Sequence, residues 1–187
     1  MLRRTWVALA ALAASSLALP PAFAQGEIKI AHIYGRSGPL EAYGKQTNTG
    51  FMMGLNYATG GTMAVAGKKI VVIERDDQGK PDLGKSLLAT AYADDKVDLA
   101  IGPTSSGVAL AMLPVAEEYK KVLLVEPAVA DSITGDKWNK YIFRTGRNSS
   151  QDAASNAAVA DQDGVSIPRW RRTTLSAATA SRRSRKR

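Results

Sequence analysis

The sequence predicts an α/β fold built on a parallel sheet. Short apolar segments rich in β-branched residues alternate with segments of helical periodicity, and each predicted strand is followed by a predicted helix. The strands are apolar along most of their length, which is typical of parallel strands that are buried on both faces. In such sheets a binding site lies beyond the carboxyl ends of the strands.

The first predicted strand and helix lie on either side of a turn. Glu27 to Tyr34 (EIKIAHIY) is rich in β-branched residues and predicts a strand, and Gly35 to Pro39 is a cluster of turn residues. Leu40 to Ala58 predicts a helix, because apolar residues recur at helical spacing from Phe51 onward. Two glycines at positions 60 and 61 end that helix.

The alternation continues to residue 125. Lys69 to Glu74 (KIVVIE) predicts the second strand, and Pro81 to Ala93 the second helix, with proline at its first turn. Val97 to Ile101, Ser105 to Tyr119 and Lys121 to Val125 predict a strand, a helix and a strand.

Residues 1–24 have the features of a secretory signal peptide. Arg3 and Arg4 form a positive region, residues 6–19 are apolar, and Ala22-Phe23-Ala24 supplies a cleavage site. The alternative is a membrane anchor, but the apolar run is shorter than the ~20 residues that a span requires. We therefore expect the protein to be exported.

The formal net charge of +8 is concentrated at the two ends of the chain. Residues 168–187 carry eight basic side chains and no acidic one, and Arg3 and Arg4 add two more. The remaining residues, 25–167, carry 15 basic and 17 acidic side chains, a net charge of −2. Because nucleic-acid binding requires a basic face on the folded domain, we expect no nucleic-acid partner.

The residue types that catalytic and metal sites require are scarce. The sequence has no cysteine, and its one histidine, His32, lies inside a predicted strand, which favours a structural role. The acidic pairs Asp76-Asp77 and Asp94-Asp95 each lie beside a helix terminus, where capping and solvation explain them better than acid–base or metal chemistry. We therefore expect no enzyme activity, no metal and no cofactor.

Three loops that follow predicted strands are the candidate site: Gly35 to Pro39, Gly102 to Ser106, and Glu126 to Asp131. The second loop, GPTSSG, ends a strand and opens a helix, so its free N–H groups and the helix dipole suit an anion, with serine hydroxyls as further donors. The alternative is that Thr104 or Ser105 only caps the helix. It is not a phosphate loop of the Walker type, because no lysine follows Gly107.

Four segments carry a resemblance to a known family. They are EIKIAHIYGRSGPLEAYGKQTNTGF, VIERDDQGKPDLGKSLLATAYADDKVDLAIGPTSSGVALAMLPVAEE, VEPAVADSITG and KYIFRTGRNSSQD, all within residues 25–167. In order and spacing they resemble the branched-chain amino acid (Leu/Ile/Val) type periplasmic solute-binding proteins of ABC importers. The resemblance implies the parallel-sheet lobe of a type I periplasmic binding protein, with most of the second lobe missing. It further implies a periplasmic location and an ABC permease in the inner membrane as partner.

The resemblance also implies which residues bind the ligand. In amino-acid binders of this family, the loops that match Ser105-Ser106 and Ala128-Val129-Ala130 hold the ligand's carboxylate and ammonium groups, and the loop that matches Gly35 to Tyr43 lines the side-chain pocket. The expected ligand-binding residues are Ser37, Tyr43, Thr104, Ser105, Ser106, Ala128, Val129 and Ala130. Where the family often has a ligand-binding threonine, this sequence has Ala128-Val129-Ala130-Asp131. The sequence therefore leaves open whether the ligand is an α-amino acid, an aromatic or aliphatic carboxylate, or an amide.

These patterns divide the chain into four parts. Residues 1–24 are the expected signal peptide, 25–145 the N-terminal ligand-binding lobe, 146–167 the start of the second lobe, and 168–187 a disordered basic tail. The composition changes abruptly after Ile167, and a shifted reading frame from Arg169 onward allows a sequence that resembles the family's next strand, turn and helix. We therefore expect the tail to be a frameshift product; the alternative is a basic arm for nucleic acid or anionic lipid.

Capture of an amino acid, or of a related small carboxylate or amide, for an ABC importer is the function that these features favour. The alternative is a ligand-sensing domain of the same fold, such as a receptor or an amide sensor. One lobe supplies half of the ligand contacts, so we expect millimolar or weaker binding by the chain as written. We also expect its sheet to lack the strands that the absent half would return.

Overall fold

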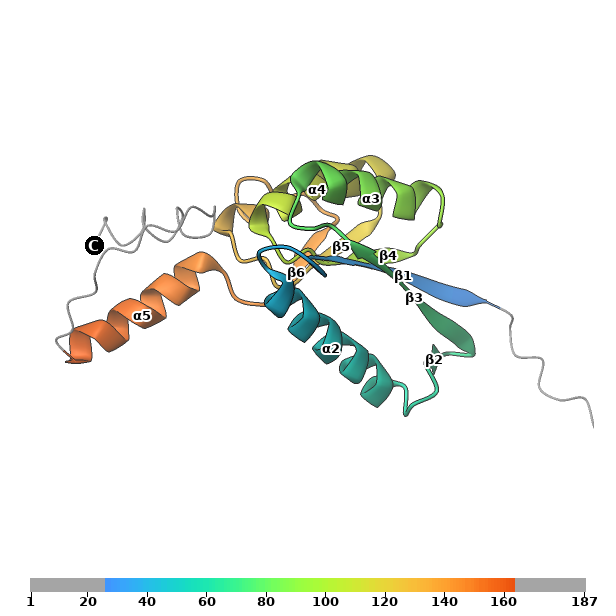
Figure 1. Ribbon diagram of the computed structural model, residues 1–187, viewed down its shortest axis with the longest axis horizontal. Helices are drawn as coiled ribbons and strands as arrows, with labels where there is room; N and C mark the ends of the chain where they lie inside the picture. Colours follow the sequence, from blue (N-terminus) through green and yellow to red (C-terminus); the bar gives the residue numbers. More distant parts are fainter. Residues whose placement is uncertain (1–25, 164–187) are drawn as a thin grey trace, which may run out of the picture.

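The computed structural model describes residues 26–163, in which a six-stranded sheet is covered by helices on both faces (Figure 1). The expected signal peptide and basic tail lie outside the described residues. The strands are β1 (Glu27–Tyr34), β2 (Ala64–Val65), β3 (Lys68–Asp76), β4 (Leu99–Ile101), β5 (Val122–Val125) and β6 (Ile142–Arg144). The helices are α2 (Glu41–Ala58), α3 (Pro81–Ala93), α4 (Ser106–Tyr119) and α5 (Ser149–Asp163), with a 3₁₀ turn, η2, at Asp131–Ile133.

The sheet confirms the predicted α/β class. Its strand order is β2-β3-β1-β4-β5-β6, and every neighbouring pair is parallel except β2 with β3. The first strand is central, pairing with β3 along its whole length and with β4 through Ile30, Ala31 and His32. As a result β1, β4 and β5 lie next to one another with their carboxyl ends at one edge.

Two apolar layers hold the helices on the sheet. Between the sheet and the helices α3 and α4 lies the larger layer, which includes Ile33, Leu88 and Met112, all fully buried. Under α2 lies the smaller one, in which Phe51 and Leu55 of α2 pack against a cluster that includes Ile30 of β1. Figure 1 shows α2 on the opposite face of the sheet from α3 and α4.

The predicted strands and helices up to residue 125 are present, and their ends differ from the predicted ones by at most two residues. The strands β2 and β6, the turn η2 and the helix α5 were not predicted. In Figure 1 α5 extends away from the sheet, and residues 154–159 of this helix are exposed. No helix within residues 26–163 is both long and apolar enough to cross a bilayer.

Candidate functional site

The three predicted loops are joined to one another by two buried hydroxyl groups. The N–H of Gly35, in the first loop, donates to Oγ1 of Thr104 at 3.2 Å. The N–H of Ala130, in the third loop, donates to Oγ of Ser106 at 3.1 Å. Both residues are buried. Thr104 therefore connects the second loop to the first, and Ser106 connects it to the third.

A glycine is required where the second loop leaves the sheet. Gly102 has a φ of +119°, and a Cβ atom placed on it would lie 1.8 Å from the carbonyl oxygen of Ile33. Any side chain there would push apart β1 and β4, the two strands that carry the first and second loops. This contact fixes the distance between these two loops.

The amino terminus of α4 faces the candidate site with free donors. Ser105 is the N-cap residue, with extended backbone, and its side chain makes no capping hydrogen bond. The alternative that Ser105 only caps the helix is therefore wrong, and Thr104 instead accepts the bond from Gly35. Because the first N–H groups of a helix have no partner within the helix, this end suits an anion, and the partly exposed Ser105 hydroxyl can add a donor.

The third loop turns its carbonyl oxygens toward β6 and α5. Guanidinium nitrogens of Arg144 donate to the carbonyls of Ala128 and Ala130, and the backbone N–H and hydroxyl of Ser149 both donate to the carbonyl of Val129. Among the three predicted residues of this loop, Ala128 and Ala130 are buried and Val129 is partly exposed. Sequence reasoning missed Arg144 and Ser149 as residues of the site.

The side chain of Asp76, the last residue of β3, holds the first loop in place. One of its oxygens accepts from the N–H groups of Arg36, Ser37 and Gln78, and the other accepts from the Ser37 hydroxyl at 2.7 Å. Burial alone would raise the pKa of Asp76, but these hydrogen bonds outweigh it and hold the pKa below its usual value. The Ser37 hydroxyl is thus directed at Asp76, while Tyr43, on the first turns of α2, is 57% exposed.

Asp77 differs from its neighbour, and the expectation that solvation explains this pair is wrong for it. Its side chain is fully buried; one oxygen accepts from the N–H of Gly79 at 2.7 Å, and no partner for the other lies among the described residues. Burial raises its pKa. Nor does either carboxylate cap α3, whose N-cap residue is Lys80. Asp77 lies beneath the first loop, where its Oδ1 would be 3.7 Å from a Cβ on Gly35.

His32 lies outside the candidate site, in the layer under α2. Its Nδ1 is 3.0 Å from Oδ1 of Asn48, and its ring stacks on Tyr34 with 4.4 Å between the ring centroids. Burial lowers the pKa of His32 and outweighs the opposing effect of Asn48. The position of this ring fits the structural role predicted for it.

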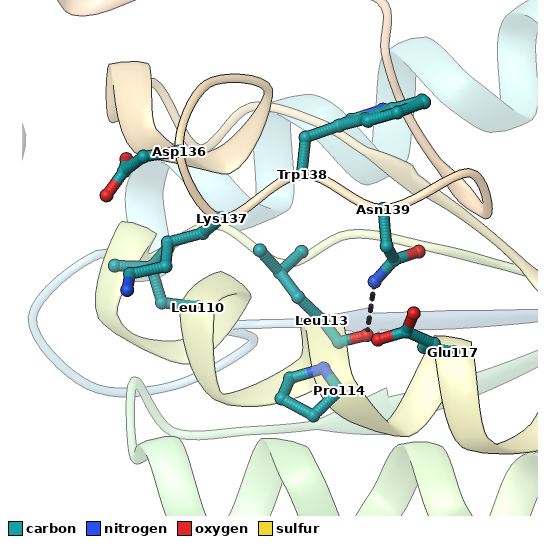
Figure 2. Close-up of a pocket in the computed structure, with 8 residues that line it drawn as sticks. All are labelled: Leu110, Leu113, Pro114, Glu117, Asp136, Lys137, Trp138 and Asn139. Carbon is teal, nitrogen blue, oxygen red and sulfur yellow. Dashed lines mark hydrogen bonds between the residues drawn. The ribbon is translucent and has the colours of Figure 1, made fainter.

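A separate groove of about 390 Å³ lies between α4 and the loop before β6 (Figure 2). Two of its lining residues are joined by a hydrogen bond, in which the side-chain nitrogen of Asn139 donates to the carbonyl of Leu113 at 3.0 Å. The lining residues are Leu110, Leu113, Pro114, Glu117, Asp136, Lys137, Trp138 and Asn139. None of them belongs to the three predicted loops. Within residues 26–163, no group of three or more histidine, aspartate or glutamate side chains could hold a metal ion.

Comparison with known proteins identifies the family. Residues 27–175 match the family model described as periplasmic binding protein. The chain is 30% identical over 145 residues to the Leu/Ile/Val-binding protein BraC3 of Rhizobium johnstonii, a match that covers 76% of this chain and 38% of that protein.

Two solved structures from Rhodopseudomonas palustris extend the likeness to three dimensions. An ABC-type branched-chain amino acid transporter protein is 71% identical with a TM-score of 0.68, over 69% of this chain and 35% of that chain. A solute binding protein of an ABC transporter from strain BisB5, in complex with 3,4-dihydroxy benzoic acid, is 30% identical with a TM-score of 0.67, over 74% of this chain and 37% of that one.

The chain thus spans less than two-fifths of the length of each of these relatives. Its parallel sheet, its three adjacent loops and the match over residues 27–175 agree with one another. The relatives named here are solute-binding proteins and not enzymes. The chain belongs to the periplasmic binding protein family.

Proposed function

We propose that the protein captures a small carboxylate in the periplasm and delivers it to an ABC importer. In this proposal residues 1–24 direct export, residues 25–145 form the first ligand-binding lobe, and residues 146–167 begin the second. The two relatives that bind Leu/Ile/Val and 3,4-dihydroxy benzoic acid both take a carboxylate, which supports the class but leaves the individual ligand open.

The observation that carries the proposal is the unequal supply of donors and acceptors at the three loops. The N-terminal N–H groups of α4 and the Ser105 hydroxyl are available donors. The carbonyls of residues 128–130 already accept hydrogen bonds from Arg144 and Ser149. An edge with free donors and occupied acceptors suits the carboxylate end of a ligand better than its ammonium end.

The expected affinity of this one lobe is low. Hydrogen bonds to a charged group contribute roughly 1.5–3 kcal/mol each, and a millimolar ligand corresponds to about 4 kcal/mol of binding free energy. Two such bonds would therefore give millimolar binding. We expect the carboxylate to lie between the first turn of α4 and the third loop, in contact with Ser105.

Titration followed by backbone amide resonances tests this assignment, because it detects weak binding and locates it. The probes are two matched pairs, benzoate with benzamide and leucine with leucinamide. We expect each carboxylate to shift the amides of Ser106, Gly107 and Val129, and each amide probe to shift them far less. Loss of the response to benzoate or leucine in Ser105→Ala would support a direct contact. Equal shifts from both members of a pair, or shifts confined to other residues, would refute the carboxylate proposal.

A further inference from the structure

The carbonyl oxygens of the third loop are held by the segment that leads from β6 into α5. Nη1 of Arg144 donates to the carbonyl of Ala128 at 3.3 Å, and Nη2 donates to the carbonyl of Ala130. Between them, the carbonyl of Val129 accepts from the backbone N–H of Ser149 at 2.8 Å and from its hydroxyl at 3.0 Å. Three consecutive carbonyls thus point toward the same two residues.

The planarity of the peptide bond determines what lies on the other side of the loop. In a trans peptide the N–H of each residue points opposite to the carbonyl of the residue before it. Holding the carbonyls of residues 128–130 therefore turns the N–H groups of Val129, Ala130 and Asp131 the other way. The middle one of these, Ala130, donates to Ser106 of α4, so this side of the loop is the one that faces the proposed site.

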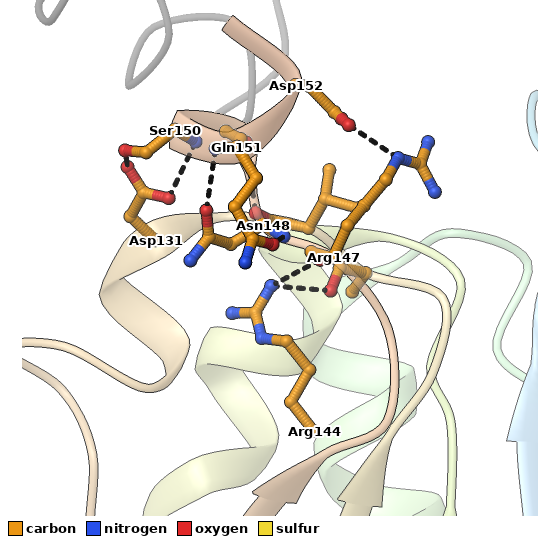
Figure 3. Close-up of polar contacts among 10 residues, drawn as sticks. Asp131, Arg144, Arg147, Asn148, Ser150, Gln151 and Asp152 are labelled. Carbon is orange, nitrogen blue, oxygen red and sulfur yellow. Dashed lines mark hydrogen bonds and ion pairs between the residues drawn. The ribbon is translucent and has the colours of Figure 1, made fainter. Parts of the chain in front are cut away.

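Arg144 is suited to this task by its position and its shape. It is the last residue of β6, paired with Val125 at the end of β5, so its side chain starts directly beside the loop. A third hydrogen bond, from Nη1 to the carbonyl of Arg147 at 3.2 Å, ties the Arg144 side chain to the segment between β6 and α5 (Figure 3). The planar fork of a guanidinium can reach two carbonyls at once, which a single ammonium group cannot do in the same geometry.

The far end of the loop is tied to the same segment. One oxygen of Asp131 accepts from the backbone N–H of Ser150 at 3.0 Å and the other from its hydroxyl, so this carboxylate caps the first turn of α5 (Figure 3). Ser149 itself is buried, at 3% exposure. The loop and the start of α5 therefore form one hydrogen-bonded unit.

We propose that Arg144 and Ser149 are positioning residues, which fix the third loop so that the N–H groups of Val129 and Asp131 face the ligand, while that of Ala130 stays bonded to Ser106. The inference rests on the proposed carboxylate site, and it adds that the donor geometry of that site is set from β6 and α5. Since the same contacts hold the first turn of α5, a change in the direction of this helix would be transmitted to the ligand-binding N–H groups.

The test compares Arg144→Lys, Arg144→Gln and Ser149→Ala with the control Arg147→Gln. Arg147 is exposed and forms an ion pair with Asp152 at 2.6 Å, so its replacement removes the same positive charge without touching the loop. The first readout needs no ligand: the amide resonances and hydrogen-exchange rates of Val129, Ala130 and Asp131. The second is the affinity for benzoate, measured by the same titration.

We expect both Arg144 variants to shift these three amides and to speed the exchange of the Ala130 amide by tenfold or more, with Arg147→Gln unchanged. The affinity for benzoate should fall about tenfold in Arg144→Lys even though the charge is kept, and less in Ser149→Ala because the backbone N–H remains. Unchanged loop amides in a folded Arg144→Lys would overturn the inference. If Arg144→Gln does not fold, the results for Arg144→Lys and Ser149→Ala test the inference.

The two proposals fail in distinguishable ways. If the wild-type chain binds neither benzoate nor leucine, the carboxylate site is refuted, while the loop amides still report whether Arg144 holds the loop. If the wild type binds and Arg144→Lys binds equally well with shifted amides, the loop is held by Arg144 but does not contact the ligand, and the positioning role is refuted.

Discussion

Replacing Ser106 with alanine should destabilise the fold, although the change removes only one oxygen atom at the first residue of α4. The Ser106 hydroxyl is 8% exposed and accepts the N–H of Ala130, a residue that is itself fully buried. In Ser106→Ala this N–H loses its partner and no water can readily replace it. The neighbouring Ser105→Ala is the natural comparison, because Ser105 is partly exposed and makes no capping bond.

The expected magnitude follows from these contacts. A buried donor left without an acceptor costs about 1–3 kcal/mol. Alanine is the better helix former by up to about 0.7 kcal/mol, which offsets part of that cost at the first residue of α4. We therefore expect Ser106→Ala to lower the free energy of unfolding by about 1–2 kcal/mol, whereas Ser105→Ala should stay within about 0.5 kcal/mol of wild type.

Urea denaturation followed by circular dichroism measures both values, and the exchange rate of the Ala130 amide reports the lost bond directly. Equal losses in the two variants would show that Ser105 caps α4 in solution, since removing a capping serine typically costs ~1 kcal/mol. That outcome, or a Ser106→Ala variant with the same free energy of unfolding as wild type, would refute the interpretation that Ser106 connects the loops and that Ser105 is free for a ligand.

Three further predictions concern the packing and the buried titratable groups. A Cβ on Gly84 would lie 2.2 Å from the side chain of Val108, so Gly84→Ala should separate α3 from α4 and lower the free energy of unfolding by about 1–3 kcal/mol in urea denaturation. A Cβ on Gly54 would meet open space, so Gly54→Ala should raise the free energy of unfolding by up to ~1 kcal/mol. Because the folded pKa of Asp77 is raised above 3.8, its charge destabilises the fold as pH rises; Asp77→Asn should be the more stable at neutral pH, and the difference should close as the pH falls toward 3.8. Because the folded pKa of His32 is lowered, the unfolded chain takes up a proton first as pH falls below 6.5; thermal melts should lose stability there in the wild type, and this part of the loss should be absent from His32→Gln.

The position of the candidate loops could be predicted from the sequence because it depends on local patterns. Strand and helix periodicities locate where each strand ends, and parallel pairing brings those ends to one edge of the sheet. These features depend on the hydrophobic pattern of a whole segment, to which each single residue contributes little. The order in which strands β1, β4 and β5 lie side by side was not predicted, because alternation alone does not determine which strands are neighbours.

The roles of individual side chains within the loops depend on contacts that no local pattern records. Ser105 and Ser106 are adjacent and chemically identical, yet one is the free N-cap residue and the other accepts a bond from a loop 24 residues away. Which of them turns inward depends on where α4 begins, and that boundary differs by one residue from the predicted one. An uncertainty of one residue is ordinary for a helix terminus, and here it decides which serine holds the third loop and which one is left for the proposed ligand.

Arg144 was missed because its function is defined by a short strand with little sequence signal. The strand β6 has three residues, and its pairing with β5 is what places the guanidinium beside the third loop. From the sequence alone, Arg144 and Arg147 are two similar basic residues in a polar segment, but the first donates to carbonyls of the loop and the second to an exposed carboxylate. The physical difference between them lies in the partner, because buried carbonyls must be satisfied whereas an exposed ion pair contributes little. The candidate site therefore follows the same requirement that governs the core: each buried polar group needs a partner, and the donors that remain on the open side of the loop are those that we propose for the ligand.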